Sequence, residues 1–335
     1  TWPAFLADCE AGHPAQTYSA GEETALAAVQ ELPGVYRHSY HGIGVYQISR
    51  GCKFNCDFCS IKTMYRCVRR KSPETVVQEL SQMKERVVFF ADDNLFYDRD
   101  SAMALLQAIT PLRKRWACQI SMDAARDDEL LSAMRKAGCF LVLMGFESLN
   151  AESLAEMHKA ANMARDYETL IRRIYSHGLM IYGTFVLGCD SDREDVFDKT
   201  FDFAVRNHIA VTNFNPLIPM PGTGVYRRME QEGRLRYKKW WLSDVYRYGE
   251  TAFLPKHMTP EALQEGCLGM RTRFYSLPCI LRRLFGAPHH LHPRNIVIFL
   301  LANIISGREI HAKQGQMLGG ELGASDVDQT EYRQA

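Results

Sequence analysis

The sequence predicts an α/β protein whose main domain is an open partial (βα)6 barrel, a TIM-like arrangement of parallel strands that does not close. From Val45 onward, short runs of β-branched and aromatic residues alternate with longer stretches of helical periodicity, as expected for parallel strands joined by helices. This unit occurs six times, whereas eight would close a complete barrel. The expected domains are an irregular linker or strap over residues 1–40, the barrel over 41–235, a mainly helical C-terminal cap over 236–312 and a frayed tail over 313–335.

The expected strands have nearly continuous apolar faces, as parallel strands covered on both sides require. They span residues 45–49, 87–91, 117–122, 140–146, 180–187 and 211–218. The helices expected with them span residues 73–85, 99–115, 127–137, 165–177, 193–208 and 224–233. Ser72-Pro73-Glu74 marks a helix start, since proline suits the first helical position. The carboxyl ends of parallel strands meet at one edge, so we expect the functional residues there.

The segments on either side of the barrel differ in composition. Proline and glycine recur too often in residues 1–40 for long elements, and the opening Thr1-Trp2-Pro3 without Met indicates a start in mid-protein. Beyond Gly233 an aromatic-rich bridge precedes helices expected at residues 260–285 and 294–306. Five residues of this region share helical spacing and are expected in the core: Met270, Phe274, Tyr275, Leu281 and Leu284. His289, His290 and His292 lie beside prolines, which favours a surface turn over a metal site.

Bulk composition excludes several classes of protein. With 46% hydrophobic and 24% charged residues, the chain of 335 residues is globular rather than disordered. A net charge of +1 gives no basic field, so no nucleic-acid partner is expected. The longest apolar run, residues 296–305, is broken by Asn303 and too short to span a bilayer. The ten cysteines suggest metal ligation and buried thiols in a reducing cytoplasm, rather than disulfides.

Three cysteines lie within eight positions directly after the first expected strand. Cys52, Cys56 and Cys59 follow Cys-x3-Cys-x2-Cys spacing, and soft thiolates select iron–sulfur clusters, zinc or copper(I). Clusters and structural zinc sites usually use four protein ligands, but the loop offers no fourth Cys or His. One metal position is therefore left for another group. A zinc knuckle completed from elsewhere is the alternative, although such a knuckle has no reason to lie on the first βα loop of a barrel.

The other seven cysteines show no tight pairing, so no auxiliary cluster is predicted. They are Cys9, Cys67, Cys118, Cys139, Cys189, Cys267 and Cys279. Cys118 and Cys139 lie in or next to expected strands. We predict that these two are buried thiols.

Polar residues follow the second expected strand, where Asp92, Asp93 and Asn94 occur in succession. Such groups at the mouth of a barrel are costly unless they form bonds there. They predict contact with a ligand. The alternative is helix capping by Asn94 or Asp98 before the helix expected at Arg99.

The fourth expected strand leads into Gly145-Phe146-Glu147-Ser148. A buried glutamate needs a partner, which a ribose hydroxyl or an ammonium group would supply. A salt bridge with Lys159 or Arg165 is the alternative. We favour the ligand contact.

The cysteine spacing, with the aromatic Phe58 before the third cysteine, resembles the signature of the radical S-adenosylmethionine (SAM) superfamily. In that family three thiolates hold three irons of a 4Fe–4S cluster, and the amino and carboxylate groups of SAM chelate the fourth. The resemblance covers about residues 40–235 and is strongest to the cobalamin-dependent branch. Its pointers are Gln47-Ile48-Ser49-Arg50-Gly51-Cys52, Asp92-Asp93-Asn94-Leu95-Phe96 and Pro219-Met220-Pro221-Gly222-Thr223.

The resemblance implies a set of cofactor-binding positions. The cluster ligands are Cys52, Cys56 and Cys59, and the SAM-binding positions are Phe58, Asp92, Asp93, Asn94, Ser121, Glu147, Ser148, Phe185, Leu187 and Gly188. The three residues after strand two resemble those that meet the methionine amino group, and the apolar residue and glycine of strand five resemble the adenine contact. At the end of the third expected strand, either Ser121 or Asp123 could face the cofactor, and a structural turn is an equal alternative. Among the basic residues after the cysteines, Arg70 is the candidate to bind the SAM carboxylate or to stabilise the cluster. The sequence identifies no catalytic residue.

The activity implied is reductive cleavage of SAM. A reduced cluster passes an electron to SAM, and the resulting 5′-deoxyadenosyl radical takes a hydrogen atom from the substrate. Methyl transfer to an unactivated carbon, with cobalamin from a domain not in this chain, is the expected outcome. The expected partners are a small-molecule or lipid substrate and an electron donor such as flavodoxin or ferredoxin. The alternatives are cobalamin-independent oxidation, cyclisation or rearrangement, and a non-catalytic metal-stabilised binding module.

Overall fold

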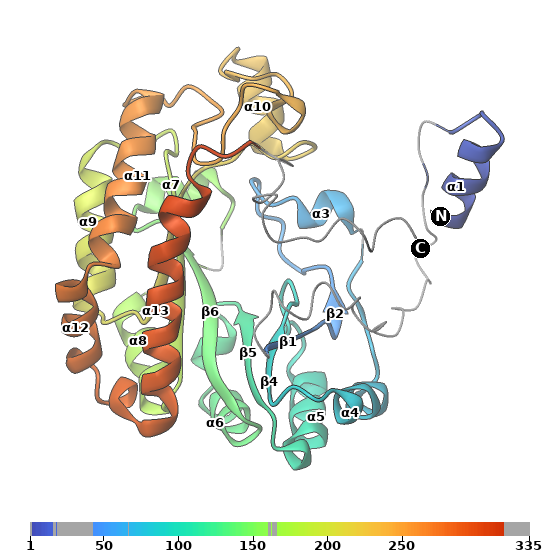
Figure 1. Ribbon diagram of the computed structural model, residues 1–335, viewed down its shortest axis with the longest axis vertical. Coiled ribbons are helices and arrows are strands. Elements are labelled where there is room, and N and C mark those ends of the chain that lie inside the picture. Colours follow the sequence, from blue (N-terminus) through green and yellow to red (C-terminus); the bar gives the residue numbers. More distant parts are fainter. Residues whose placement is uncertain are drawn as a thin grey trace, which may run out of the picture. The chain divides into compact units, whose positions relative to one another are not determined.

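The computed structural model describes residues 2–15, 18, 43–65, 67–159, 162 and 166–317 (Figure 1). Six parallel strands follow one another in a single sheet in the order β1-β4-β5-β6-β7-β8. Their bounds are Ile43–Tyr46 (β1), Val87–Phe90 (β4), Arg115–Ile120 (β5), Cys139–Glu147 (β6), Met180–Leu187 (β7) and Val211–Pro216 (β8). This order confirms the predicted α/β class and the open (βα)6 partial barrel. The chain divides into an N-terminal unit, residues 1–144 with 166–181, and a C-terminal unit, residues 145–165 with 182–335.

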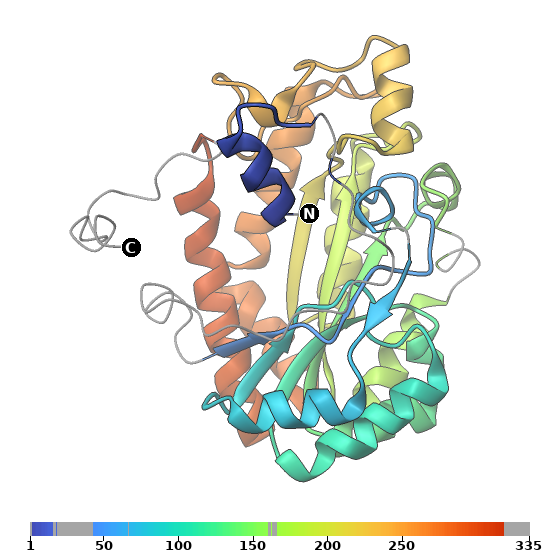
Figure 2. The same cartoon turned by 90° about the vertical axis from the view of Figure 1, so that its right-hand side faces the viewer.

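In the N-terminal unit, capped amphipathic helices cover the strands (Figures 1 and 2). These helices are α4 (Pro73–Gln82), α5 (Arg99–Ile109), α6 (Asp128–Lys136) and α8 (Tyr167–Ser176). Ser72 accepts a hydrogen bond from the backbone N–H of Thr75, and Pro73 is the first helical residue, so the predicted start of α4 is confirmed. Asp98 and Asp127 cap α5 and α6 in the same way. Cys118 and Cys139 have no exposed surface, as predicted.

In the C-terminal unit, four helices pack together (Figure 1): α9 (Asp195–Arg206), α11 (Pro260–Phe274), α12 (Leu277–Gly286) and α13 (Pro293–Lys313). Helix α11 also lies against β8. The prediction of one helix over residues 260–285 was wrong, because the chain breaks at Ser276 and Pro278 lies in the first turn of a new helix. Of the predicted core stripe, Met270, Phe274 and Leu284 are buried, whereas Leu281 is 40% exposed. α7 (Ala151–Glu156) and α10 (Gly224–Gln231) complete this unit.

Several local features differ from the prediction. Trp2–Glu10 forms a helix, α1, within the segment predicted to be irregular. Residues 1, 16–17 and 19–40 of that segment lie outside the described residues, as do residues 318–335 of the predicted tail. The first strand ends at Tyr46, and a separate antiparallel ribbon pairs β2 (Ser49–Arg50) with β3 (Arg69–Arg70). A short helix, α3 (Ile61–Met64), follows the cysteines. Among the described residues, no helix combines the length and apolar character that a membrane span requires.

The predicted surface turn at the histidines was wrong for His290, which has no exposed surface. A short 3-10 helix, η5 (Pro288–Leu291), places this imidazole on the ring of Phe299, and its Nδ1 lies 3.1 Å from the carbonyl oxygen of Arg283. The Arg283 guanidinium is equally buried and donates to the carbonyl oxygens of Ile209 and Ala210. The burial of His290 could not be predicted from the sequence, because adjacent prolines usually mark exposed turns. Tertiary packing encloses the segment here.

Acid is expected to destabilise the protein through His289 and His290. Burial lowers the pKa of these imidazoles to about 3 and about 4, from an ordinary value of 6.5. Below pH 6.5 the unfolded chain therefore binds protons that the folded chain does not, and the free energy of unfolding falls by up to about 1.4 kcal/mol per pH unit for each histidine. Urea unfolding at pH 7 and pH 5 measures this loss. A H289Q/H290Q double variant should lose less between the two pH values than a variant of the exposed His292, H292Q, and equal losses would contradict the assignment.

Candidate functional site

The Cys loop, residues 51–68, leaves and rejoins the N-terminal unit at the β2–β3 ribbon. Cys52, Cys56 and Cys59 are partly buried thiols on this loop, and the backbone N–H of Cys59 donates to the carbonyl oxygen of Cys56 at 3.1 Å. Among the described residues, no three His, Cys, Asp or Glu side chains are arranged to hold a single metal ion. A cluster differs from an ion, since each thiolate binds a different iron and the three sulfurs need not converge on one point.

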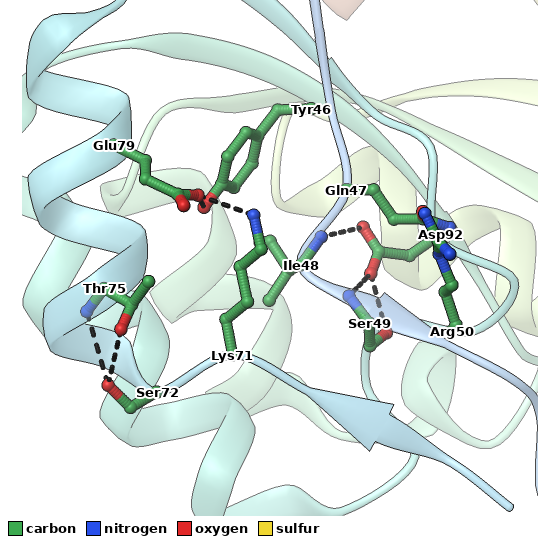
Figure 3. Close-up of polar contacts among 10 residues, drawn as sticks. All are labelled: Tyr46, Gln47, Ile48, Ser49, Arg50, Lys71, Ser72, Thr75, Glu79 and Asp92. Carbon is green, nitrogen blue, oxygen red and sulfur yellow. Dashed lines mark hydrogen bonds and ion pairs between the residues drawn. The ribbon is translucent and has the colours of Figure 1, made fainter. Parts of the chain in front are cut away.

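Asp92 binds the segment that leads into the Cys loop (Figure 3). Its Oδ1 accepts from the backbone N–H of Ser49 and, at 2.6 Å, from the hydroxyl of Ser49. Its Oδ2 accepts from the backbone N–H of Ile48 at 3.3 Å. Asp92 is 3% exposed, and burial raises its pKa to about 6 although these hydrogen bonds lower it. A buried carboxylate thus fixes the backbone just before the loop.

Asp93 binds the next part of the same segment. Its Oδ2 accepts from the backbone N–H of Gly51 at 2.8 Å. Gly51 has a φ of +97°, and a Cβ there would lie 2.7 Å from the carbonyl oxygen of Cys67. Glycine is therefore required at this position both by backbone conformation and by space.

A buried ion pair lies on the other side of the ribbon (Figure 3). The Nζ of Lys71 is 2.6 Å from Oε2 of Glu79 and 4.7 Å from the centre of the Tyr46 ring. The hydroxyl of Tyr46 donates to the same Glu79 oxygen at 2.5 Å. Burial, followed by this hydrogen bond, raises the pKa of Tyr46 far above its usual value. The backbone N–H of Lys71 donates to the carbonyl oxygen of Ile48 at 3.0 Å, so the ion pair anchors the segment from a second direction.

Among the buried polar atoms of this unit that have no hydrogen-bond partner within the described residues are Oδ1 of Asn94 and Oγ of Ser121. Asn94 is 2% exposed, and its Nδ2 lies 3.9 Å from Sγ of Cys52. Because buried polar groups normally find partners, the Asn94 side chain beside Cys52 is a candidate for contact with a ligand.

The other sequence candidates of this unit have partners within the protein. Asp98, rather than Asn94, caps α5. Arg70 stacks on Tyr97 and lies 3.6 Å from Asp98, while Asp123 pairs with Lys53 of the Cys loop at 3.7 Å. Phe58 is partly buried within the loop.

In the C-terminal unit, Glu147 closes β6 in an unusual backbone conformation, with a φ of +62°. Its side chain turns back over Gly145, where a Cβ would collide with the carboxylate. Oε1 of Glu147 is 2.9 Å from Nζ of Lys159, so the alternative salt bridge is present. Arg165 lies outside the described residues. Asn162 donates to the carbonyl oxygens of Gly145 and Phe146, while its own Oδ1 has no partner among the described residues.

Strand β7 ends in buried apolar residues, and a glycine with a positive φ follows it. Phe185 and Leu187 have no exposed surface, and the Phe185 ring stacks between those of Phe146 and Phe214, at 5.3 and 5.5 Å between centroids. The Phe185 side chain is thus a core side chain, and its predicted adenine contact remains a prediction. Gly188 follows with a φ of +92°.

Asp192 is a residue that the sequence reasoning missed. It is 2% exposed, and its Oδ2 accepts from the backbone N–H groups of Gly188 and Cys189 at 2.9 and 3.0 Å. Its Oδ1 accepts from the Ser153 hydroxyl at 2.7 Å, and burial raises its pKa. An aspartate shortly after Gly188 could have signalled such a turn, since aspartate side chains readily bind nearby backbone N–H groups. Ser148 similarly accepts from the backbone N–H of Asn150 at 3.0 Å.

Comparison with known proteins identifies the family. The sequence profile of the radical SAM superfamily matches residues 46–203, from the end of β1 through most of α9. The chain belongs to the radical SAM superfamily. The predicted membership of the radical SAM superfamily is confirmed.

Two curated relatives of this radical SAM chain are methyltransferases. It is 32% identical to bacteriochlorophyllide d C-12(1)-methyltransferase of Chlorobaculum tepidum over 72% of this chain and 53% of the relative. It is 30% identical to hopanoid C-2 methylase of Rhodopseudomonas palustris over 72% of this chain and 46% of the relative. The chain thus spans about half the length of the curated relatives it matches.

A solved structure shares the fold. The radical SAM methyltransferase TsrM of Kitasatospora setae, solved with cobalamin and a 4Fe–4S cluster, matches with a TM-score of 0.54 and 17% identity over 69% of this chain and 45% of TsrM. At this identity the likeness concerns the fold alone.

The residues of this radical SAM chain fit the cofactors of its family, a 4Fe–4S cluster and SAM. Three thiols with soft donor character lie between Cys52 and Cys59 with no fourth Cys or His among them. Oδ1 of Asn94, which has no partner within the described residues, is suited to accept from an ammonium group. The candidates fall into two sets, one in each unit. The structure brings the aspartates after β4 to the base of the Cys loop, and it brings Glu147 to Lys159.

Proposed function

We propose that this chain is the radical SAM part of an enzyme that cleaves SAM reductively and methylates an unactivated carbon. The observation that carries the proposal is the Cys loop with the unpartnered Asn94 oxygen beside Cys52. When bound, the cluster and SAM supply a 5′-deoxyadenosyl radical that takes a hydrogen atom from the substrate. The protein's task is to hold the cofactors and to exclude water and competing hydrogen donors.

Particular residues would hold each group. Cys52, Cys56 and Cys59 would ligate three irons, and Phe58 would pack beside them. Asn94 Oδ1 would accept from the SAM ammonium group, which would satisfy a buried acceptor that has no partner among the described residues. Ser121 Oγ offers a second unpaired atom of the same unit.

In the C-terminal unit, we assign Glu147 and Ser148 to the ribose or amino acid portion of SAM. The φ of +62° at Glu147 supports this assignment, since left-handed backbone at a non-glycine residue concentrates at functional sites. Leu187 and Gly188 would lie at the adenine, where a glycine lets the backbone approach closely. Phe185 would support this strand from the core.

The wider reaction follows from the relatives. Methyl transfer is supported by the two methyltransferases above. Cobalamin would come from a domain outside this chain, and a flavodoxin or ferredoxin would supply the electron. The substrate would be a small molecule or a lipid, and an oxygen-sensitive cluster favours the cytoplasm.

An anaerobic assay tests the proposal. The protein is reconstituted with iron and sulfide, reduced with dithionite and given SAM, and 5′-deoxyadenosine is measured by mass spectrometry. We expect this product in the presence of the cluster. A chain that carries about one zinc ion and forms no product would contradict the proposal and support a metal-stabilised binding module. Methylcobalamin with the substrate of the Chlorobaculum tepidum relative then tests methyl transfer.

A further inference from the structure

We propose that Asp92 and Asp93 are positioning residues, which fix the backbone from which the Cys loop departs and make no contact with SAM. The inference rests on the proposed function, because a positioning role needs a cluster to position. It divides the Asp92-Asp93-Asn94 run into two parts. Only Asn94 would face the cofactor.

The hydrogen bonds of the two aspartates are the evidence for separating them from Asn94. Asp92 accepts from two consecutive backbone N–H groups, of Ile48 and Ser49, and from the Ser49 hydroxyl. Asp93 accepts from the backbone N–H of Gly51. Ile48 and Ser49 precede the Cys loop and Gly51 is its first residue, so none of these donors lies between Cys52 and Cys59. At 3% exposure, Asp92 is enclosed with its donors and has little surface left for a ligand.

Lys71 and Glu79 contact the segment before the Cys loop from its other side (Figure 3). The carbonyl oxygen of Ile48 accepts from Lys71, whose ammonium group pairs with Glu79 in a buried site. Lys71 directly follows β3, the strand by which the chain leaves the Cys loop. Both ends of the loop are therefore tied to β4 and α4. Fixing the ends of a loop removes conformations in which its ligands lie apart, and this lowers the ordering cost of binding a cluster.

Asn94 has the complementary pattern. Its Nδ2 points to Cys52, and its Oδ1 lacks a partner within the described residues. A positioning residue should have its hydrogen bonds complete in the protein alone, whereas a ligand-binding residue should leave one open. Asp92 matches the first description and Asn94 the second.

The test compares Asp92→Asn with Asn94→Ala. Asparagine at position 92 replaces one acceptor oxygen by an NH2 group, which would face an N–H or O–H donor, so at least one bond is lost. Both variants are reconstituted anaerobically, and iron loss to a chelator is followed without SAM. SAM binding is then measured from the change in the EPR spectrum of the reduced cluster. We expect Asp92→Asn to lose iron about tenfold faster, with a SAM affinity within roughly threefold of wild type in the chains that keep the cluster. Asn94→Ala should retain iron and lose SAM affinity.

Two further variants make the result specific. Asp127→Asn changes another hydrogen-bonded aspartate of the same unit, the cap of α6, and should leave iron retention unchanged. Ser49→Ala should speed iron loss in the wild-type background and add little to Asp92→Asn, because both changes remove the same hydrogen bond. Urea unfolding of each variant confirms that it is folded.

The outcomes separate this inference from the proposed function. If Asp92→Asn keeps iron like wild type but loses SAM affinity, Asp92 is a SAM ligand and the inference is overturned. Additive effects of Ser49→Ala and Asp92→Asn would also overturn it. If the wild-type chain takes up no cluster, the proposed function itself fails.

Discussion

Replacing Cys56 by alanine is expected to lower 5′-deoxyadenosine production more than about 100-fold. Cys56 is the central cysteine of the Cys loop, and its loss would leave two thiolates for a cluster that needs three. Mutating a residue that only supports a metal ligand typically lowers metal affinity or activity about 10- to 100-fold. Removing a ligand itself should lower product formation by more than that. The measurement is iron content together with product formation after anaerobic reconstitution.

Cys67→Ala is the matched control for this experiment. Cys67 lies at the end of the same loop, is exposed and falls outside the Cys-x3-Cys-x2-Cys spacing. It should retain both the cluster and the product. Equal loss in the two variants would indicate damage to the loop rather than to a ligand, and full activity of Cys56→Ala would refute the assignment of the cluster.

Replacing Phe185 by alanine is expected to reduce the free energy of unfolding by about 3–5 kcal/mol, the usual cost of a phenylalanine-to-alanine change in a core. The Phe185 ring is fully buried between Phe146 and Phe214 and meets the edge of Phe203. Its removal leaves a cavity and ends two stacking contacts. Urea unfolding measures the loss.

Phe285→Ala provides the same chemical change at a side chain that is 67% exposed. We expect an effect of about 0.5 kcal/mol or less there. A Phe185→Leu variant, which keeps most of the volume, allows SAM affinity to be measured in a folded chain. Two results together would show that the side chain contacts adenine and that the core role is wrong. These are a strong loss of SAM affinity in Phe185→Leu and little change in the free energy of unfolding in Phe185→Ala.

The fold could be predicted from the sequence because each βα unit carries its own local signal. The apolar runs, the Ser72-Pro73 start of α4 and the glycines after the helices fix element type and order, and six parallel units have few topologies open to them. Boundaries were less accurate. The first strand ends at Tyr46, and the ribbon of β2 and β3 was missed, because two-residue strands carry no periodicity.

The candidate site divides in the same way. Cysteine spacing is local and identified the Cys loop without any structure. The partners of charged residues are not local: Asp92 binds Ser49 across 43 positions, and Lys71 binds Glu79 beneath Tyr46. Sequence reasoning therefore assigned the three residues after β4 one shared role. Their hydrogen bonds distinguish Asp92 and Asp93, which bind the entry to the Cys loop, from Asn94.

The sequence by itself determined the order of six βα units, the family and the three cysteines, since all of these depend on residues close together along the chain. Only the tertiary structure decided which polar side chains are already satisfied within the protein, as with Asp92 and Asp192, and which have an atom without a partner among the described residues, as with Asn94. It also placed His290 in the core, where neighbouring residues suggested a surface. The physical reason is that burial and hydrogen-bond pairing are properties of the packed chain, and distant segments supply the partners.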